Sequence, residues 1–373
     1  RDLHVRSCRQ RQMCIRDRVW GLLPHALRGE LCLLPSGPED HLAHLHPTEP
    51  ADASIAVVVT TSGSTGRPKG VMLSAEAMLA SARATREHLG GPMEWWTPLP
   101  RQWVAGLMCG LRALEAGTSA HLLRSDLGDL PRPDPTVSRA LSIVPTQLSR
   151  ALERPDLVER LTGFSAVLVG GAATDPSMVE RARATGIPVV TTYGMSETCG
   201  GCVYDGIPLP GVEITLDDQT GRITIGGPQL FSGYRAAPGD TAQSLVDGHL
   251  LTQDRGRWSH GRLDVLGRVD DVVISGGVNI DLAHVRQEAR ALHPEAEVIG
   301  LPDAEWGSMV VLVIPGITGE YPTSPWRERL AATGLARQAL PRRVVGVDRL
   351  PRTSSGKIDR QALARLLEPP RGH

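Results

Sequence analysis

Two lysines stand out in this chain of 373 residues, because the other 38 of its 40 Lys and Arg residues are arginines. Lys69 lies in TTSGSTGRPKG (60–70) and Lys357 in PRTSSGKIDR (351–360), both loops rich in small residues. Lysine presents a compact ammonium that can meet one oxygen, whereas arginine presents a wide planar fork. The pattern therefore indicates two positions where a point charge acts on a phosphate or a carboxylate.

The glycine loop at 61–70 carries too many small polar residues for a simple packing turn. Its backbone N–H groups and hydroxyls can wrap a polyphosphate, as backbone nests do. It is not a Walker A loop, because Lys69 is followed by Gly70 and the glycine spacing differs. A flexible linker is disfavoured by the apolar strand predicted before it and the helix predicted after it. The candidate phosphate contacts are Thr61, Ser62, Gly63, Ser64, Thr65, Gly66 and Lys69.

A second motif, YGMSET (193–198), offers an aromatic ring, a carboxylate and a hydroxyl within six residues. A nucleotide could stack on Tyr193 and meet Thr198 through a phosphate, with Glu197 as a Mg²⁺ ligand. Further along the chain, the Asp254 carboxylate can accept both ribose hydroxyls, and Arg268 offers a second ribose or phosphate contact. Taken alone, either of these two could belong to a surface ion pair.

Strands and helices alternate on both sides of these motifs. The β-branched run at 54–60 predicts a buried strand, and Ser74 predicts the N-cap of a helix over 75–89. Further strands are predicted at 71–73, 141–144, 165–169 and 187–192, with helices at 146–152 and 176–184. This order predicts a mostly parallel sheet flanked by helices, with ligands at the carboxyl ends of its strands. The loops at 61–70, 170–173 and 193–201 are therefore expected to converge on one crevice.

The pattern changes twice, which predicts two unequal α/β domains. Short alternating segments between 205 and 265 predict a small antiparallel subdomain, and mixed α/β character returns after Asp270. We expect a large domain over 19–269 and a small, mobile α+β domain over 270–373. Residues 1–18, with six Arg, two Cys and no periodicity, are expected to be a disordered or non-native leader outside the fold.

Composition excludes several classes of protein. A net charge of -1 and 3% aromatic residues argue against nucleic acid as a partner. No apolar run approaches the roughly 20 residues that span a bilayer, and no secretory signal is visible. Six scattered cysteines fit the reduced cytoplasm, and Cys199–Cys202 lacks the second ligand pair of a zinc site. The three histidines at 41, 44 and 46 are expected in a solvated loop.

Four ordered motifs resemble those of the acyl-adenylate-forming ligase superfamily. They are TSGSTGRPKG (61–70), YGMSET (193–198), GRVDD with ISGGVNI (267–280) and PRTSSGKIDR (351–360). Within the superfamily, PLP (98–100), VAGL (104–107), IVPTQL (143–148) and the run to YDG (204–206) are most similar to the o-succinylbenzoate–CoA ligases of menaquinone biosynthesis. Only about 50 residues precede the glycine loop, as in the short actinobacterial form of those enzymes.

The resemblance implies ATP, Mg²⁺ and coenzyme A as small molecules and assigns roles to the motif residues. Lys357 would bridge the substrate carboxylate and the α-phosphate, and Glu197 would hold Mg²⁺. Thr198 would be a catalytic residue that contacts a phosphate. Asp270 would be the hinge about which the small domain rotates between half-reactions. The implied ATP contacts also include Gly171, Ala172, Tyr193, Gly194, Asp254 and Arg268. The implied acyl or CoA pocket contains Trp103, Thr146, Gly170, Gly200, Gly276 and Gly277.

One departure from the family leaves the acyl substrate open. Trp103 stands where the family often has a histidine near the acyl pocket. The second carboxylate of o-succinylbenzoate would need Thr146 and an arginine, for which Arg101, Arg112 and Arg150 are candidates. For each arginine, a place on the surface is at least as good an interpretation.

Three other functions compete with this interpretation. The first is another aryl- or acyl-CoA ligase with the same ATP motifs. The second, a carrier-protein adenylation domain, is disfavoured because no carrier module follows Lys357. The third, a non-catalytic nucleotide-binding protein, is disfavoured by the joint retention of Lys357, Glu197 and Asp254. A homodimer is left open.

Overall fold

The computed structural model describes residues 12–35, 42–46, 49, 51–61, 69–316, 318–352 and 358–367, with the backbone alone at 12–17 and 270. It divides into two compact units. The first comprises Arg1–Thr215, Thr224–Thr252 and Trp258–Asp264, and the second comprises Leu216–Ile223, Gln253–Arg257 and Val265–His373. The second unit thus includes three short stretches, 216–223, 253–257 and 265–269, that were predicted to belong to the large domain. The predicted hinge at Asp270 stays a prediction.

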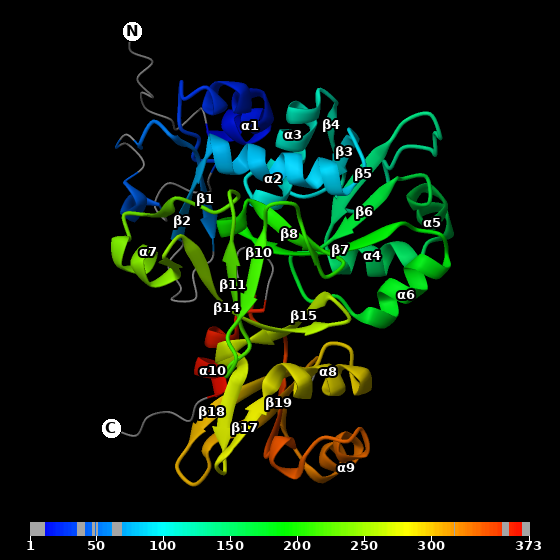
Figure 1. Ribbon diagram of the computed structural model, residues 1–373. Helices are drawn as coiled ribbons and strands as arrows, with labels where there is room; N and C mark the ends of the chain where they lie inside the picture. The colour runs from blue at the N-terminus through cyan, green and yellow to red at the C-terminus, as the bar shows by residue number, and fades with distance from the viewer. Residues whose placement is uncertain are drawn as a thin grey trace. The chain divides into compact units, whose positions relative to one another are not determined.

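A seven-stranded sheet forms the centre of the first unit (Figure 1). Its first five strands are parallel and the last two are antiparallel, so the predicted parallel sheet is confirmed. Parallel strands are covered on both faces, which explains why the apolar run at 166–169 is buried throughout. In sheet order the strands are β4 (Ala120–Leu122), β3 (Glu94–Thr97), β5 (Arg139–Ile143), β6 (Ala166–Val169), β7 (Val189–Met195), β8 (Gly200–Tyr204) and β9 (Ile207–Pro208).

Two helices of this unit, α2 and α6, begin at residues whose side chains cap them. The hydroxyl of Ser74 accepts a hydrogen bond of 3.1 Å from Ala77 N, which confirms it as an N-cap. The first helix begins at Gln12, so 12–18 are helical rather than an unstructured leader, whereas 1–11 lie outside the described residues. The helices are α1 (Gln12–Leu27), α2 (Ala75–His88), α3 (Val104–Ala116), α4 (Pro145–Leu152), α5 (Pro155–Leu161), α6 (Pro176–Ala184) and α7 (Pro238–Ser244), with 3-10 turns η2 (Ala43–Leu45) and η3 (Ser196–Thr198).

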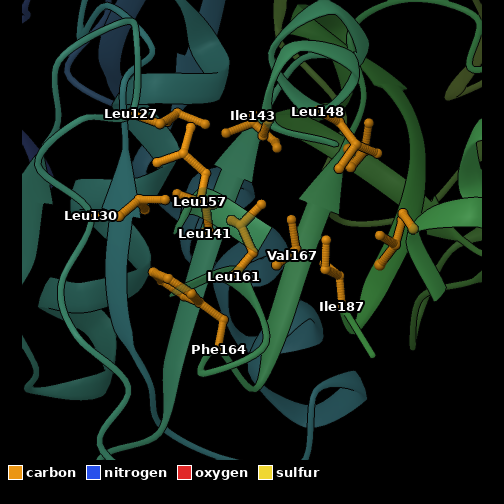
Figure 2. Packing of buried hydrophobic residues seen from close by; sticks show 14 of the residues in the cluster. Leu127, Leu130, Leu141, Ile143, Leu148, Leu157, Leu161, Phe164, Val167 and Ile187 are labelled. Atoms are coloured by element: carbon orange, nitrogen blue, oxygen red, sulfur yellow. The ribbon is translucent and has the colours of Figure 1, made fainter. Parts of the chain in front are cut away.

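One apolar cluster holds the parallel strands against their helices (Figure 2). Leu141 and Ile143 project from β5 and Val167 from β6, and all three are at most 1% exposed. They pack with Leu148 of α4 and Leu161 of α5, which are fully buried. This packing fixes the strands whose carboxyl ends carry the predicted site.

The glycine loop does not join the parallel sheet as predicted. It connects β1 (Ile55–Thr61) to β2 (Lys69–Ser74), which pair antiparallel and form a separate sheet with β12 (Gly233–Arg235). The seven residues between the two strands are too few for a parallel crossover, which needs a dozen or more, so the chain turns back as a hairpin.

The segment after 205 is antiparallel, as predicted. Its five-stranded sheet contains β10 (Glu213–Leu216), β11 (Arg222–Gly226), β14 (His249–Ser259) and β13 (Leu245–Val246) in that order, and β15 (Arg262–Arg268) pairs with β14. The division between the two units falls within these strands.

The second unit is built around a mixed six-stranded sheet, as expected for an α+β domain. Its path is β17 (Val278–Asp281), β16 (Val272–Ser275), β19 (Gly307–Pro315), β21 (Arg343–Val347) and β20 (Gly319–Tyr321), and β18 (Glu297–Asp303) pairs with β19. The remaining elements are η4 (Val269–Asp271), α8 (Leu282–Leu292), α9 (Ser324–Ala332), η5 (Arg337–Ala339) and α10 (Arg360–Leu367). The predicted fold class is therefore confirmed.

Within the described part of the chain, no helix combines the length and the apolar character that a membrane crossing requires.

The parallel core should be sensitive to loss of volume. Leu141→Ala removes a side chain that is fully buried, so we expect the free energy of unfolding to fall by about 2–5 kcal/mol. Urea denaturation followed by circular dichroism measures this change. Leu122→Ala, in the same sheet but 45% exposed, is the control and should lose less than about 1 kcal/mol. Equal losses would show that the cluster does not carry the stability of the sheet.

Candidate active site

The carboxyl ends of the parallel strands gather seven of the residues predicted to surround a nucleotide and an acyl group. Trp103 follows β3 and precedes α3, and Thr146 lies in the first turn of α4, directly after β5. Because these strands are parallel neighbours, their following loops share one edge of the sheet. The same edge carries Gly170, Gly171 and Ala172 after β6, and Tyr193 and Gly194 near the end of β7.

Two of these glycines are required by close approach. A Cβ at Gly170 would lie 2.1 Å from Thr192 Oγ1, and a Cβ at Gly194 would lie 2.1 Å from Gly200 O. The backbone of β6 therefore packs directly against β7, and β7 against the turn into β8. Both contacts leave the edge without side chains at these positions.

Glu197 is presented by a tight reversal between β7 and β8. The chain leaves β7 at Met195, makes the 3-10 turn η3 and returns through Cys199 in the left-handed conformation, with φ of 52°. Thr198 is fully buried in this turn. Its hydroxyl accepts a hydrogen bond of 2.9 Å from Met195 N and donates one of 2.6 Å to Gly200 O. Thr198 thus holds the turn together, and its predicted role in catalysis stays a prediction.

Tyr234 of β12 joins the Glu197 turn to the glycine loop. Its hydroxyl donates a hydrogen bond of 2.8 Å to Glu197 Oε1, and Phe231 N donates one of 2.9 Å to Glu197 O. The Lys69 ammonium lies 4.8 Å from the centre of the Tyr234 ring. The predicted metal ligand and the predicted phosphate-binding lysine therefore meet around one aromatic side chain.

Asp240 completes this cluster. It lies in the first turn of α7, and its Oδ2 is 2.8 Å from Lys69 Nζ. Burial, followed by the nearby Glu197 carboxylate, raises the pKa of Tyr234, so the phenol keeps its proton and donates to Glu197. Neither Tyr234 nor Asp240 was predicted from the sequence. The one available signal was that Tyr234 is among only four tyrosines in the chain.

The residues present suit a magnesium ion that is shared with a phosphate. Within the described residues, no three His, Cys, Asp or Glu side chains gather as a metal cage. A site with one carboxylate such as Glu197 fits Mg²⁺, which keeps several waters and is usually completed by substrate phosphates.

Several predicted phosphate contacts cannot be placed. Ser62, Gly63, Ser64, Thr65 and Gly66 lie outside the described residues, as does Lys357. The loop ends are described, and Thr61 pairs with Lys69 across the β1–β2 hairpin.

The remaining predicted residues belong to the second unit. Asp254 lies on β14, Arg268 ends β15, and Asp270 lies in η4. Gly276 and Gly277 form the turn between β16 and β17 with φ of 58° and 78°, the pair of positive values that a type I′ hairpin requires. Their roles toward ribose and coenzyme A stay predictions.

The three candidate arginines differ in setting. Arg112 is only 5% exposed and stacks over Trp95 at 4.9 Å, so its interpretation as a surface residue is wrong. Arg101 is half-buried above the ring of Trp20, and Arg150 is exposed on α4, as is Thr146. The charge of Arg112 is tolerated because an aromatic face replaces part of its hydration.

The cysteines support packing rather than redox or metal chemistry. Cys199 and Cys202 are both at most 1% exposed and are free thiols. Burial raises the pKa of Cys199 and raises the pKa of Cys202 to about 12. Thiolates are therefore scarce at neutral pH, which disfavours both nucleophilic and metal-binding roles.

Known proteins with similar sequences and structures define the class to which this site belongs. A family model described as AMP-binding enzyme matches residues 15–235. The chain is 39% identical over 353 residues to "Probable 2-succinylbenzoate--CoA ligase" of Mycobacterium tuberculosis, covering 90% of each chain. It is 31% identical to the 2-succinylbenzoate--CoA ligase of Enterococcus faecalis, covering 85% of this chain and 71% of that protein.

A solved structure agrees with the sequence relatives. It is the o-succinylbenzoate CoA synthetase (MenE) from Bacillus subtilis in complex with the acyl-adenylate intermediate OSB-AMP, with a TM-score of 0.75 and 26% identity. The alignment covers 95% of this chain and 82% of that one. The chain belongs to the AMP-binding enzyme family, which confirms the resemblance seen in its motifs.

Alkylation should distinguish the buried thiols from the exposed one. At pH 8 we expect iodoacetamide to label Cys32, which is exposed, at least about tenfold faster than Cys199 or Cys202. Peptide mass mapping gives the rate at each site, and the urea-unfolded protein, in which the rates should converge, is the control. Comparable rates in the folded protein would contradict the buried, protonated state of the pair.

Proposed function

We propose that this protein is an AMP-forming acid–CoA ligase that converts o-succinylbenzoate, ATP and coenzyme A to o-succinylbenzoyl-CoA, AMP and pyrophosphate in menaquinone biosynthesis. The observation that carries the proposal is the 39% identity, over 90% of both chains, with a relative named for this reaction. The convergence of Lys69, Tyr234 and Glu197 supports it independently, because it supplies a cation and a metal-binding carboxylate at one place.

The first half-reaction brings two anions together. A carboxylate oxygen of the acid attacks the α-phosphorus of ATP, a P–O bond forms, and the bond to pyrophosphate breaks. Mg²⁺ bound through Glu197 would neutralise phosphate charge. The chain's own contribution is electrostatic: Lys357 would meet the substrate carboxylate and the α-phosphate, and backbone N–H groups of the glycine loop would hold the outer phosphates.

Lys69 has an ion-pair partner that a phosphate could replace. Its side chain is 23% exposed and that of Asp240 is 42% exposed, so their ion pair is hydrated and weak. A phosphate carries more charge than Asp240 and can compete for the ammonium. We propose that Lys69 moves from Asp240 toward pyrophosphate while the ring of Tyr234 keeps it near Glu197.

The second half-reaction forms the thioester. The sulfur of coenzyme A attacks the adenylate carbonyl, the C–S bond forms, the bond to the AMP oxygen breaks, and the thiol proton passes to solvent. AMP is a good leaving group, so no dedicated general base is required. We propose that the second unit turns about Asp270 between the halves and brings the Gly276–Gly277 turn toward the pantetheine arm.

Trp103 is the specific observation that favours a second candidate function. It replaces a frequent histidine at the sheet edge, and an indole there can fill space that a smaller ring leaves open. Another aryl or acyl acid is therefore the alternative substrate of the same chemistry. The cytoplasmic location, the homodimer and the absence of nucleic-acid partners stay predictions.

Acid-dependent ATP–pyrophosphate exchange tests the function directly. Exchange is measured with o-succinylbenzoate, benzoate and medium-chain fatty acids, followed by CoA addition and mass detection of the thioester. We expect both activities with o-succinylbenzoate. Lys357→Ala should lower exchange at least about 100-fold while ATP still binds, because it removes charge stabilisation from the transition state. Wild-type exchange by this variant would refute the role of Lys357.

The other outcomes separate the candidate functions. Exchange with a different acid alone keeps the ligase chemistry and rejects o-succinylbenzoate. ATP binding without exchange for any acid would favour a non-catalytic nucleotide-binding protein.

Tyr234→Phe tests the hydrogen bond to Glu197. Loss of a bond to a charged acceptor, worth about 1.5–3 kcal/mol, should raise the Mg²⁺ concentration for half-maximal exchange about tenfold or more. Calorimetric titration of Mn²⁺ into the protein with ATP provides a readout that does not depend on turnover. Tyr321→Phe, whose hydroxyl lies in the second unit and contacts Thr318 O, is the matched control. An unchanged metal affinity in Tyr234→Phe would rule out this orienting role.

A further inference from the structure

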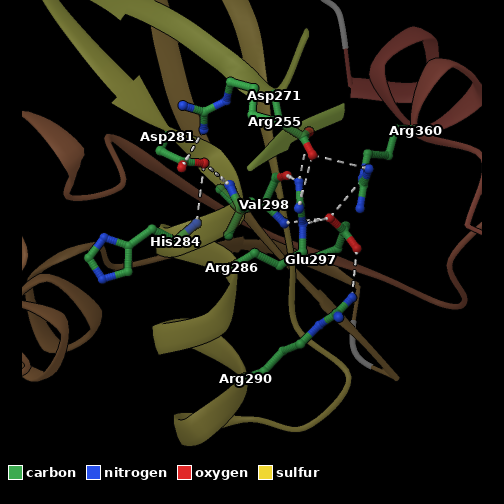
Figure 3. A network of polar contacts seen from close by, with 10 residues as sticks. Arg255, Asp271, Asp281, His284, Arg286, Arg290, Glu297, Val298 and Arg360 are labelled. Carbon is green, nitrogen blue, oxygen red and sulfur yellow. Dashed lines mark hydrogen bonds and ion pairs between the residues drawn. The ribbon is translucent and has the colours of Figure 1, made fainter. Parts of the chain in front are cut away.

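A buried network of charges in the second unit has no part in the chemistry described above (Figure 3). Glu297, the first residue of β18, is fully buried, and Arg286 and Asp271 are 5% and 8% exposed. Buried charges are costly unless they are paired and hydrogen-bonded. Such a network therefore fixes the segments that carry its side chains relative to one another within this unit.

Arg286 of α8 is the centre of the network. Its Nε contacts Glu297 Oε1, and its Nη2 donates hydrogen bonds of 3.2 Å to Asp271 Oδ1 and 3.0 Å to Val298 O. One guanidinium thus joins α8 to β18 and to η4, the segment that contains the predicted hinge.

Two further arginines approach the same carboxylate from the solvent side. Arg290 of α8 donates a hydrogen bond of 3.0 Å to Glu297 Oε2, and Arg360 of α10 donates one of 3.1 Å to Glu297 Oε1. Their side chains are 39% and 38% exposed. They differ in one respect: Arg360 also lies 3.5 Å from Asp271 Oδ2 and belongs to another segment of the chain.

That segment is the one that carries Lys357. Arg360 is the first residue of α10 and follows Lys357 by three positions in the sequence. The backbone before it is closed by an antiparallel bridge between Arg352 and Ile358 and by a hydrogen bond of 2.8 Å from Asp359 N to Pro351 O. Arg360 therefore ties the base of the Lys357 loop to Glu297 and Asp271.

We propose that Arg360 is a positioning residue that fixes the start of α10, the segment that follows Lys357 in the sequence, against the segment next to the predicted hinge. Its planar fork reaches carboxylates on two different segments, which restrains both the place and the direction of the first turn of α10. A lysine that must meet one reacting oxygen is sensitive to displacements of about 1 Å, so loss of this restraint should reduce turnover rather than binding. This inference rests on the proposed function, in which Lys357 acts in adenylate formation.

Arg360→Gln and Arg290→Gln form a matched pair for the test. Each removes one half-exposed arginine from Glu297 and leaves Arg286 and one other in place. We expect Arg360→Gln to lower kcat for ATP–pyrophosphate exchange at least about tenfold, with KM for ATP changed less than about threefold. Thioester formation from supplied acyl-adenylate should change less than about threefold in both variants, and Arg290→Gln should leave all three quantities near wild type.

Hydrogen exchange provides a readout that does not depend on activity. Asp359 N and Leu363 N are bonded within the restrained segment, so their exchange rates should rise about tenfold in Arg360→Gln and not in Arg290→Gln. Arg360→Lys, which keeps the charge but not the fork, should restore part of the turnover. If the glutamine variants unfold, the same measurements are made on Arg360→Lys and Arg290→Lys. A larger loss of kcat in Arg360→Lys than in Arg290→Lys then supports the inference.

Three results would overturn the inference in distinguishable ways. Equal effects of the Arg360 and Arg290 substitutions would show that the network is only structural. Faster hydrogen exchange in Arg360→Gln with wild-type kcat would show a restraint that does not serve Lys357. Absence of acid-dependent exchange in the wild-type protein would reject the proposed function and the positioning role with it, while hydrogen exchange would still report whether Arg360 restrains the segment.

Discussion

The burial of the parallel strands on both faces is the constraint on which the rest of the first unit depends. Leu141 and Val167 point into one apolar layer and Ala140 and Leu168 into the other, so the inner strands β5 and β6 are covered by apolar side chains on both faces. Polar chemistry is therefore displaced to the edge where β3, β5, β6 and β7 end. The glycines at that edge follow from the same packing, because β6 and β7 approach too closely for a side chain at Gly170.

The turn after β7 places a charged residue, Glu197, at this edge of the sheet. A parallel strand followed by an antiparallel one must turn within a few residues, and Thr198 stabilises that turn with its buried hydroxyl. Glu197 is thereby held against β12, which belongs to a different sheet, and Tyr234 bonds it there. Since β12 pairs with β2, the same tyrosine faces Lys69. The acid and the lysine are brought together by strand pairing between distant segments, with the aromatic ring as their common contact.

Local signals in the sequence predicted the parallel character of the sheet and the helices α2, α4 and α6, and non-local pairing explains part of what they missed. The helix predicted at 176–184 has these bounds in the structure, where Asp175 caps it and Pro176 is its first residue. The loops that hold Gly170 and Gly194 were predicted at this edge because they follow apolar runs, whereas Trp103 and Thr146 were implied by the resemblance to the family. Tyr234 and Asp240 were missed, since their relation to Glu197 and Lys69 arises only when β12 pairs with β2. The burial of Arg112 was missed for a similar reason, because a charged side chain gives no sign of the ring that covers it.

The cations that the structure describes around the two charged clusters are of two kinds. Arg286 and Arg360 each reach carboxylates on more than one segment, and the planar fork of a guanidinium holds such contacts in a fixed direction better than a compact ammonium does. Lys69, in contrast, makes a single hydrated contact with Asp240, and such a contact can be exchanged for a phosphate. Arginine thus serves where a fixed arrangement is needed, and lysine where a cation must change partners. Under the proposed function, Lys69 is a cation that exchanges its carboxylate partner for a phosphate, and the arginines around Glu297 hold the start of α10, the segment that follows Lys357 in the sequence.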